Sequence, residues 1–425
     1  MSPDLLERRE RALGPAYRLF YDQPVHLVRG EGAWLYDAAG KRYLDCYNNV
    51  ASVGHCHPRV VDALCRQAST LNTHTRYLHE NIVAYAERLG ATLPGDLGVC
   101  MFVCTGTEAN DLAVRIARAV TGHRGLLVTE NAYHGNSTTV YEMSTEEYPA
   151  EERPGYLEAV EAPCSYRGRF RDSGPQAAVG FARLLEPAIE RLAGRGHGPA
   201  MFVTDNVFSS NGVLTPDPGY LAEAYRLVRA AGGLAVADEV QSGLCRLGDH
   251  YWGFQDSGVV PDIVTMGKPL GDGHPLAAVV TTPAIASEFA RKYDYFNTFG
   301  GNPVSAAVGL AVLDVIEREQ LLQNVHDTGA GLGAGLRALM TRHEWIGDVR
   351  GKGLFYGVEI VRDRATREPA PAEAGRIREL LRANGVLLGT SGPFKNVIKI
   401  RPPLVFSPVQ AGLLLEHLDE ALAAI

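Results

Sequence analysis

Two stretches decide the fold class, Gly233-Leu234-Ala235-Val236-Ala237-Asp238 and Ile263-Val264-Thr265-Met266-Gly267-Lys268. Each is a nearly continuous apolar run that ends at a charged residue. Such runs are typical of strands buried on both faces of a mainly parallel sheet. Ligands of parallel α/β sheets bind at the carboxyl ends of the strands. Asp238 and Lys268 are therefore the first candidates for a functional site.

The same pattern extends on both sides of these two stretches. Further apolar runs occupy residues 99–104, 125–129, 200–204 and 276–280, and helical patterns occupy 109–120, 179–192 and 219–231. This alternation predicts a large α/β domain. The first 60 residues predict a helix and short strands, and the chain after residue 315 alternates strands with helices. We expect residues 1–60 and 316–425 to form a smaller α+β domain beside a large domain of residues 61–315.

The composition argues against several classes of protein. The 425 residues include 46% apolar and 21% charged residues, and the net charge of −8 argues against a nucleic-acid or membrane-surface binder. Seven scattered cysteines without a CxxC pair argue against disulfides and zinc, so we expect no metal. The first 15 residues are charged, and no apolar run approaches the ~20 residues of a membrane span. A cytoplasmic protein is expected.

Lysine chemistry is restricted to six positions, because the chain has 6 Lys and 35 Arg. Only Lys268 directly follows a predicted buried strand, between Gly267 and Pro269. Desolvation there would lower the pKa of its amine and make it a nucleophile. The alternative is an ordinary lysine of a surface loop.

Three other strand ends carry suitable chemistry. Asp238 lies thirty residues before Lys268. If it is buried, it needs a cationic partner, and a protonated pyridine nitrogen is one such partner. The alternative role for Asp238 is that of a helix N-cap. Thr105-Gly106-Thr107 opens a helix and suits a phosphate, or simply forms a capping box. Tyr133 can stack on a planar ring, or belong to a polar loop. Together with Lys268 these features describe a pyridoxal phosphate site.

Longer motifs resemble the class III aminotransferases, which are pyridoxal 5'-phosphate enzymes of fold type I. The resemblance covers nearly the whole chain and rests on residues 238–243, 261–268 and 297–303. Residues 45–58, 71–79 and 266–275 are most similar to the branch that contains ethanolamine-phosphate and phosphohydroxylysine phospho-lyases. The resemblance implies a large domain with a mainly parallel seven-stranded sheet flanked by helices.

The resemblance also implies roles for single residues. Lys268 would form the internal aldimine and move the proton, and Asp238 would pair with the ring nitrogen. The other implied cofactor contacts are to the ring hydroxyl (Gln241), the ring faces (Val240 and Tyr133, with His134 beside it), the phosphate (Gly106 and Thr107) and the phosphate of a neighbouring subunit (Thr298). A homodimer with shared active sites is therefore expected, with a tetramer as a further possibility.

Departures from the family pattern concern the substrate. Asp205 stands where many members carry Glu, and Lys399 stands where members acting on α-amino acids often carry Arg. Lys399 and Arg401 are two apart on a predicted strand and hence share a face, where they could bind an anion or form a surface ion-pair ladder. Arg76 is a further candidate anion binder.

Two reactions fit this site. The resemblance favours transamination, in which an amino group passes from an amine or amino acid to a keto acid or aldehyde. The alternative is elimination of phosphate from a phosphorylated amine such as phosphoethanolamine or phosphohydroxylysine. The paired Lys268 and Asp238 argue against a non-catalytic scaffold, and the absence of GxxxxGK[ST] argues against a P-loop NTPase.

Overall fold

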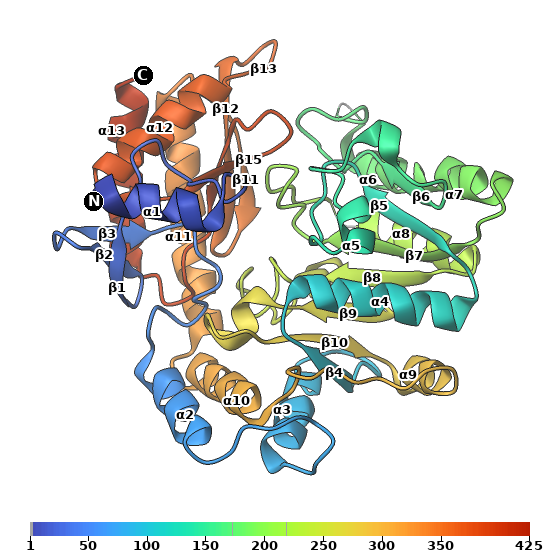
Figure 1. Cartoon of the computed structure of the whole chain (residues 1–425). Coiled ribbons are helices and arrows are strands. Elements are labelled where there is room, and N and C mark those ends of the chain that lie inside the picture. The colour runs from blue at the N-terminus through green and yellow to red at the C-terminus, as the bar shows by residue number, and fades with distance from the viewer. Residues whose placement is uncertain (1–2, 172, 218) are drawn as a thin grey trace.

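The computed structural model describes residues 3–171, 173–217 and 219–425. A seven-stranded sheet with the order β4-β10-β9-β8-β7-β5-β6 lies at its centre (Figure 1). β10 runs antiparallel to both neighbours, and the other pairs are parallel. The strands are β4 (Val99–Val103), β5 (Gly125–Thr129), β6 (Leu157–Val160), β7 (Pro199–Asp205), β8 (Leu234–Asp238), β9 (Ile263–Met266) and β10 (Ala277–Thr281).

Helices cover both faces of this sheet, which explains the continuous apolar runs. Leu126 and Val128 of β5 belong to one buried cluster with α4, whereas Leu127 between them belongs to a second cluster with α7 and α8. Successive strand residues point to opposite faces, so each face needs apolar residues of its own. The helices are α4 (Gly106–Thr121), α5 (Thr138–Met143) and α9 (Pro283–Ala290) on one side, and α6 (Ala177–Ala182), α7 (Leu185–Gly194) and α8 (Tyr220–Ala230) on the other.

The two ends of the chain lie side by side in Figure 1 and share a sheet. β14 (Val386–Leu387) pairs in parallel with β3 (Arg42–Asp45). β3 pairs on its other side with β2 (Trp34–Asp37), and β2 pairs with β1 (Leu27–Glu31), both antiparallel. A third sheet contains β11 (Ile346–Lys352), β12 (Phe355–Asp363), β13 (Glu368–Pro369), β15 (Gly389–Ser391) and β16 (Val397–Ile400). The accompanying helices are α1 (Pro3–Leu13), α12 (Pro371–Ala383) and α13 (Pro408–Ala423).

Helix α10 (Pro303–Arg318) packs against α2 (Pro58–Ala68) and α3 (Glu80–Gly90) below the large sheet, and α11 (Leu321–Arg342) leads from there to the C-terminal sheet (Figure 1). Within the described ranges, every helix is too short or too polar to cross a membrane. The α/β fold with a mainly parallel sheet of seven strands is confirmed. The domain boundaries at residues 60 and 315 stay a prediction.

Two of the differences from the sequence prediction have an identifiable physical reason. β6 was not predicted, because Glu158, which forms ion pairs with Arg191 and Arg195, interrupts its apolar run. The single helix predicted over 179–192 is two helices, α6 and α7. Pro187 lacks the N–H that would donate to the Arg183 carbonyl; Glu186 N donates to that carbonyl at 3.1 Å and tightens the turn.

Candidate active site

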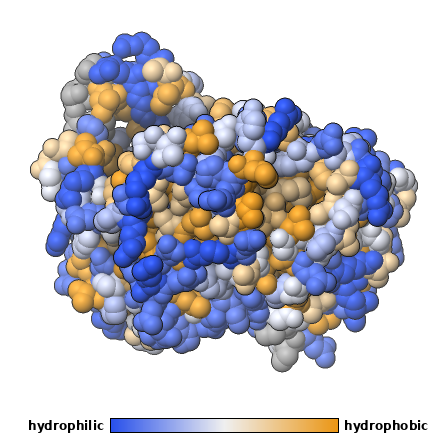
Figure 2. Space-filling model, turned by 90° about the horizontal axis from the view of Figure 1, so that it is seen from below, coloured by the Kyte–Doolittle hydropathy of each residue, from blue (hydrophilic) through white to orange (hydrophobic). Residues whose placement is uncertain are grey.

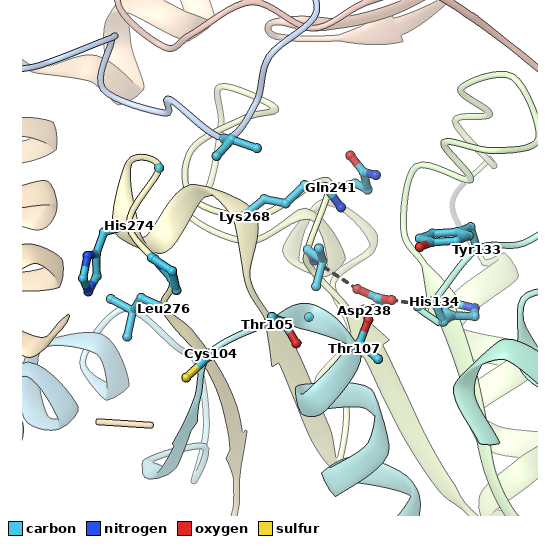
Figure 3. A pocket seen from close by; sticks show the side chains of 16 residues that line it. Cys104, Thr105, Thr107, Tyr133, His134, Asp238, Gln241, Lys268, His274 and Leu276 are labelled. Carbon is cyan, nitrogen blue, oxygen red and sulfur yellow. Dashed lines mark hydrogen bonds and ion pairs between the residues drawn. The ribbon is translucent and has the colours of Figure 1, made fainter. Parts of the chain in front are cut away.

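Lys268 lies at the carboxyl end of β9, where a short 3₁₀ turn begins. Its side chain extends over the pocket in Figure 3 and, among the described residues, has no hydrogen-bond or ion-pair partner. Burial lowers the pKa of its amine, and the positive charge of Arg401 lowers it further. An amine that is desolvated and unpaired is more often neutral, and therefore more nucleophilic, than a surface lysine.

Asp238 ends β8, and only 3% of its surface is exposed. Its Oδ2 accepts hydrogen bonds from His134 Nδ1 at 2.7 Å and from Asn110 Nδ2 at 3.0 Å, and its Oδ1 accepts one from Val240 N at 3.1 Å. The interaction with His134 is drawn in Figure 3. Three N–H donors match an ionised carboxylate, which only accepts hydrogen bonds. The site thus holds a fixed negative charge.

The start of α4 forms a cradle beside this carboxylate. Thr105 caps the helix, because its Oγ1 accepts a hydrogen bond from Glu108 N at 3.1 Å. The N–H groups of Gly106 and Thr107 belong to the first turn, where intrahelical acceptors are lacking and an anion is favoured. A Cβ at position 106 would lie 2.9 Å from Val240 Cγ2, so glycine is required where Val240 packs against the helix start.

A cavity of about 330 Å³ joins these groups. Figure 3 shows Tyr133 on one side, Lys268 and Gln241 above, Thr105 and Thr107 below, and His274 and Leu276 at the far end. The lining residues lie at the ends of strands, in the loops beside them and at the start of α4. They are Val50, Cys104–Thr107, Tyr133–Gly135, Asp238, Val240, Gln241, Lys268 and Gly273–Leu276. Eight of the nine predicted cofactor residues meet here, and the exception is Thr298.

These groups fit pyridoxal phosphate. An unpaired amine can bind its aldehyde, a carboxylate can pair with its ring nitrogen, and the glycine at the helix start admits its phosphate. Val240 and Tyr133 both line the cavity that the ring would occupy. The individual contacts to the cofactor stay predictions, whereas the positions of these residues around one cavity are given by the structure.

Neither of the two predicted substrate cations lines the cavity, and Arg401 contacts Gln241 of its wall. Arg401 is 4% exposed; its Nη1 donates to Gln241 Oε1, and its Nε donates to the Tyr47 carbonyl at 3.0 Å. Lys399 donates to the Ser209 carbonyl at 3.3 Å. Burial, followed by the charge of Arg401, lowers the pKa of Lys399 to about 7. Strand β16 ends at Ile400, so Arg401 directly follows it, and the binding of an anion by these two cations stays a prediction.

The other predicted residues are placed differently. Asp205 is buried at the end of β7, where it accepts hydrogen bonds from Ser209 N and Val207 N, and burial raises its pKa. Arg76 and Thr298 are exposed and lie outside the cavity of their own chain. The Arg76 guanidinium stacks on Phe296 at 4.0 Å, in the loop that carries Thr298. Their roles stay predictions.

Sequence reasoning missed two polar side chains that hold the site residues. Asn110 binds Asp238, and Asn49 Nδ2 donates to Gln241 Oε1 at 3.1 Å. Asn49 lies in the motif of residues 45–58, and Asn110 lies in the helical pattern of residues 109–120. Nothing in their local sequence distinguishes them from ordinary asparagines, because their partners are 128 and 192 residues away in the chain.

Comparisons with known proteins agree with this geometry. The family model for class-III aminotransferases matches residues 20–422. The chain is 42% identical over 434 residues to "alanine–glyoxylate aminotransferase 2-like" of Drosophila melanogaster, covering 99% of this chain and 87% of that one. It is 38% identical over 435 residues to "ethanolamine-phosphate phospho-lyase homolog 1" of Caenorhabditis elegans, covering 99% and 93%.

Among solved structures, a phospholyase from Arthrobacter in complex with phosphoethanolamine is similar with a TM-score of 0.96 and 44% identity, over 99% of this chain and 100% of that chain. Fold and pocket thus define a pyridoxal-phosphate enzyme of fold type I. The chain belongs to the class-III aminotransferase family.

A first prediction concerns the reactive amine. Purified protein supplied with pyridoxal phosphate should show a visible-range absorbance that borohydride removes, and Lys268→Ala should lack it. Lys292→Ala is the matched control, because that amine lies on the large domain's surface and donates to the Ala119 carbonyl. Retention of the borohydride-sensitive band in Lys268→Ala would show that another amine binds the cofactor.

Proposed function

We propose that the protein eliminates phosphate from a phosphorylated primary amine, such as phosphoethanolamine or phosphohydroxylysine. The observation that carries the proposal is the pair Lys399 and Arg401. Within the described residues, neither cation has a carboxylate within ion-pair distance, and their acceptors are neutral oxygens of Tyr47, Gln241 and Ser209. Transamination, the activity that the sequence analysis favours, is the second candidate.

Burying two adjacent cations without an ion-pair partner costs free energy. Withdrawing a cation from water costs several kcal/mol, on the order of 3–5, unless an opposite charge compensates it. The positive charge of Arg401 also repels that of Lys399 and lowers the pKa of the Lys399 amine. A phosphate dianion bound between them would supply two negative charges, whereas a carboxylate would supply one. The site therefore favours a phosphorylated substrate.

The chemistry divides between the cofactor and the chain. When bound, pyridoxal phosphate withdraws electrons from the amine-bearing carbon of the substrate. The Lys268 amine can then accept the proton from that carbon. Lys399 and Arg401 would stabilise the charge on the phosphate as its C–O bond breaks and it leaves with the electron pair. With one water, phosphoethanolamine yields acetaldehyde, ammonia and phosphate.

Both activities are represented among the relatives. The phospholyase from Arthrobacter and the C. elegans phospho-lyase homolog support elimination, and the latter is 38% identical to this chain. The Drosophila protein, at 42% identity, supports transamination. Lys268 and Asp238 serve both reactions, so the test has to follow the products.

The deciding experiment measures phosphate release. The holoenzyme should release inorganic phosphate and ammonia in equal amounts from phosphoethanolamine or phosphohydroxylysine, without a keto acid. Ethanolamine and lysine are the matched substrates that lack the leaving group and should yield no ammonia. Amino transfer to a keto acid or aldehyde, with phosphate release absent, would establish transamination instead.

The pH dependence of anion binding tests Lys399 separately. Sulfate keeps its two charges across the neutral range and can serve as a competitor of the phosphorylated amine. Because Lys399 has a pKa of about 7, it loses its proton as the pH rises above that value. Inhibition by sulfate should therefore weaken by about tenfold or more as the pH rises, because the loss of one charge-assisted hydrogen bond changes the dissociation constant by about that factor.

Two variants isolate this effect from the charges of Arg401, Asp205 and Glu146, which also act on Lys399. Lys399→Arg should keep sulfate binding at high pH, because a guanidinium remains protonated. Lys399→Met should bind sulfate weakly at every pH. An unchanged pH profile in Lys399→Met would exclude Lys399 as the titrating group.

We also propose that two copies associate through the face below the large sheet. Figure 2 shows hydrophobic side chains gathered near the middle of this face. Large apolar side chains are exposed on α2, on α3, in the connection between them and in the loop before α10: Val61, Leu71, Tyr77, Leu78, Val83, Tyr293, Phe296 and Phe299. Exposed apolar patches of this kind mark interfaces. Thr298 lies in the same loop, which supports the expected contact to a second active site.

The proposed association can be tested by measuring the oligomeric state of the protein. The wild-type protein should have about twice the chain mass of 45.9 kDa by light scattering. Phe299→Asp should reduce the mass to one chain, because a charge would be buried at the interface. Val409→Asp is the control, since Val409 is more exposed but lies on α13, on another face. A Phe299→Asp variant with the wild-type mass would contradict this interface.

A further inference from the structure

We propose that Asn110 is a positioning residue that holds Asp238 in place for the ring nitrogen of the cofactor. Asn110 lies in α4 and is completely buried. It is absent from the lining of the cavity, so it acts through Asp238 and touches neither cofactor nor substrate. The inference depends on the cofactor alone and holds for elimination and for transamination.

Three hydrogen bonds fix the orientation of the Asn110 amide. Its Nδ2 donates to Asp238 Oδ2 at 3.0 Å and to the His134 carbonyl at 2.8 Å, and its Oδ1 accepts from Thr265 Oγ1 at 2.8 Å. A flipped amide would place its oxygen against a carboxylate and a carbonyl, both of which only accept. These two acceptors therefore determine that Asn110 presents its N–H groups to Asp238, and the Thr265 hydroxyl supports this orientation by donating to Oδ1.

This arrangement distinguishes the two oxygens of Asp238. Oδ2 is occupied by Asn110 and His134, whereas Oδ1 accepts from Val240 N alone. Oδ1 is thus the oxygen with capacity left for a further donor, and a protonated ring nitrogen is such a donor. With Oδ2 fixed by two donors from different elements, the carboxylate cannot rotate to exchange its oxygens.

The position of Asn110 in α4 relates it to the phosphate cradle. Gly106 and Asn110 are four residues apart and therefore lie on the same face of the helix, one turn from each other. The helix that presents N–H groups at its start thus also fixes the carboxylate. One rigid element would set the distance between the phosphate site and the ring-nitrogen site, which is a constant of the cofactor. This role of α4 explains why a buried position of the helix carries the amide of Asn110, although packing alone would favour an apolar residue there.

A matched pair of asparagines tests the proposal. Asn396 is 1% exposed, and its Nδ2 also donates to a carboxylate, Glu359 Oε1 at 3.2 Å, and to a backbone carbonyl, that of Ile360 at 2.7 Å. Asn110→Asp and Asn396→Asp thus make the same chemical change in a buried site. Only the first lies beside Asp238.

The readouts are the dissociation constant of pyridoxal phosphate and the pH titration of the visible absorbance of the bound cofactor, neither of which needs a substrate. Asn110→Asp should weaken cofactor binding by about tenfold or more, because a donor to a charged group becomes a repelling acceptor. Its absorbance titration should shift. Asn396→Asp should lower the melting temperature of the protein but leave the cofactor affinity and titration as in the wild type.

Thr265→Val serves as a second, milder variant that keeps the shape of the site. It removes one of the three hydrogen bonds that hold the Asn110 amide, so its cofactor affinity should lie between those of the wild type and Asn110→Asp. If Asn110→Asp does not fold, Thr265→Val decides the matter: wild-type affinity and titration would overturn the proposal. Equal losses of cofactor affinity in Asn110→Asp and Asn396→Asp would also overturn it, because the effect would then be general destabilisation.

Discussion

The burial of one carboxylate constrains the whole active site. Asp238 is nearly inaccessible to water, and a charge in that position is tolerated only where donors replace its hydration. The donors come from α4, from the loop after β5 and from the backbone after β8. Three segments distant in sequence must therefore meet at one point. Their meeting also places the helix start, the aromatic wall and the reactive amine around the cavity.

The sequence predicted that Lys268 and Asp238 lie close together, because the rule that parallel sheets bind ligands at their carboxyl edge is geometric. Lys268 and Asp238 follow apolar runs, so their neighbourhood could be inferred before any fold was known. The family resemblance then supplied roles for Gln241, Tyr133 and Val240, all of which line the cavity. The strands themselves were predictable where their apolar runs are continuous, and β6 was missed because Glu158 interrupts its run.

Other parts could not be inferred from local sequence. Asn110 and Asn49 acquire meaning only through partners far along the chain. The break between α6 and α7 depends on a single missing N–H at Pro187, which an apolar periodicity does not register. Arg76 and Thr298 lie outside the cavity, and the role expected of Thr298 involves a second copy of the chain, whose position local sequence does not specify.

The parallel pairing of β14 with β3 has a consequence for biosynthesis. Leu44 and Val386 are register partners, so the hydrogen-bonding edge of the N-terminal hairpin has to wait for nearly the entire polypeptide to leave the ribosome. Unpaired strand edges are sites of faulty association, and contacts of such high sequence separation form late. The nascent chain therefore carries an open edge through most of its translation, and shielding of that edge by a chaperone would protect it until residues 386–387 arrive.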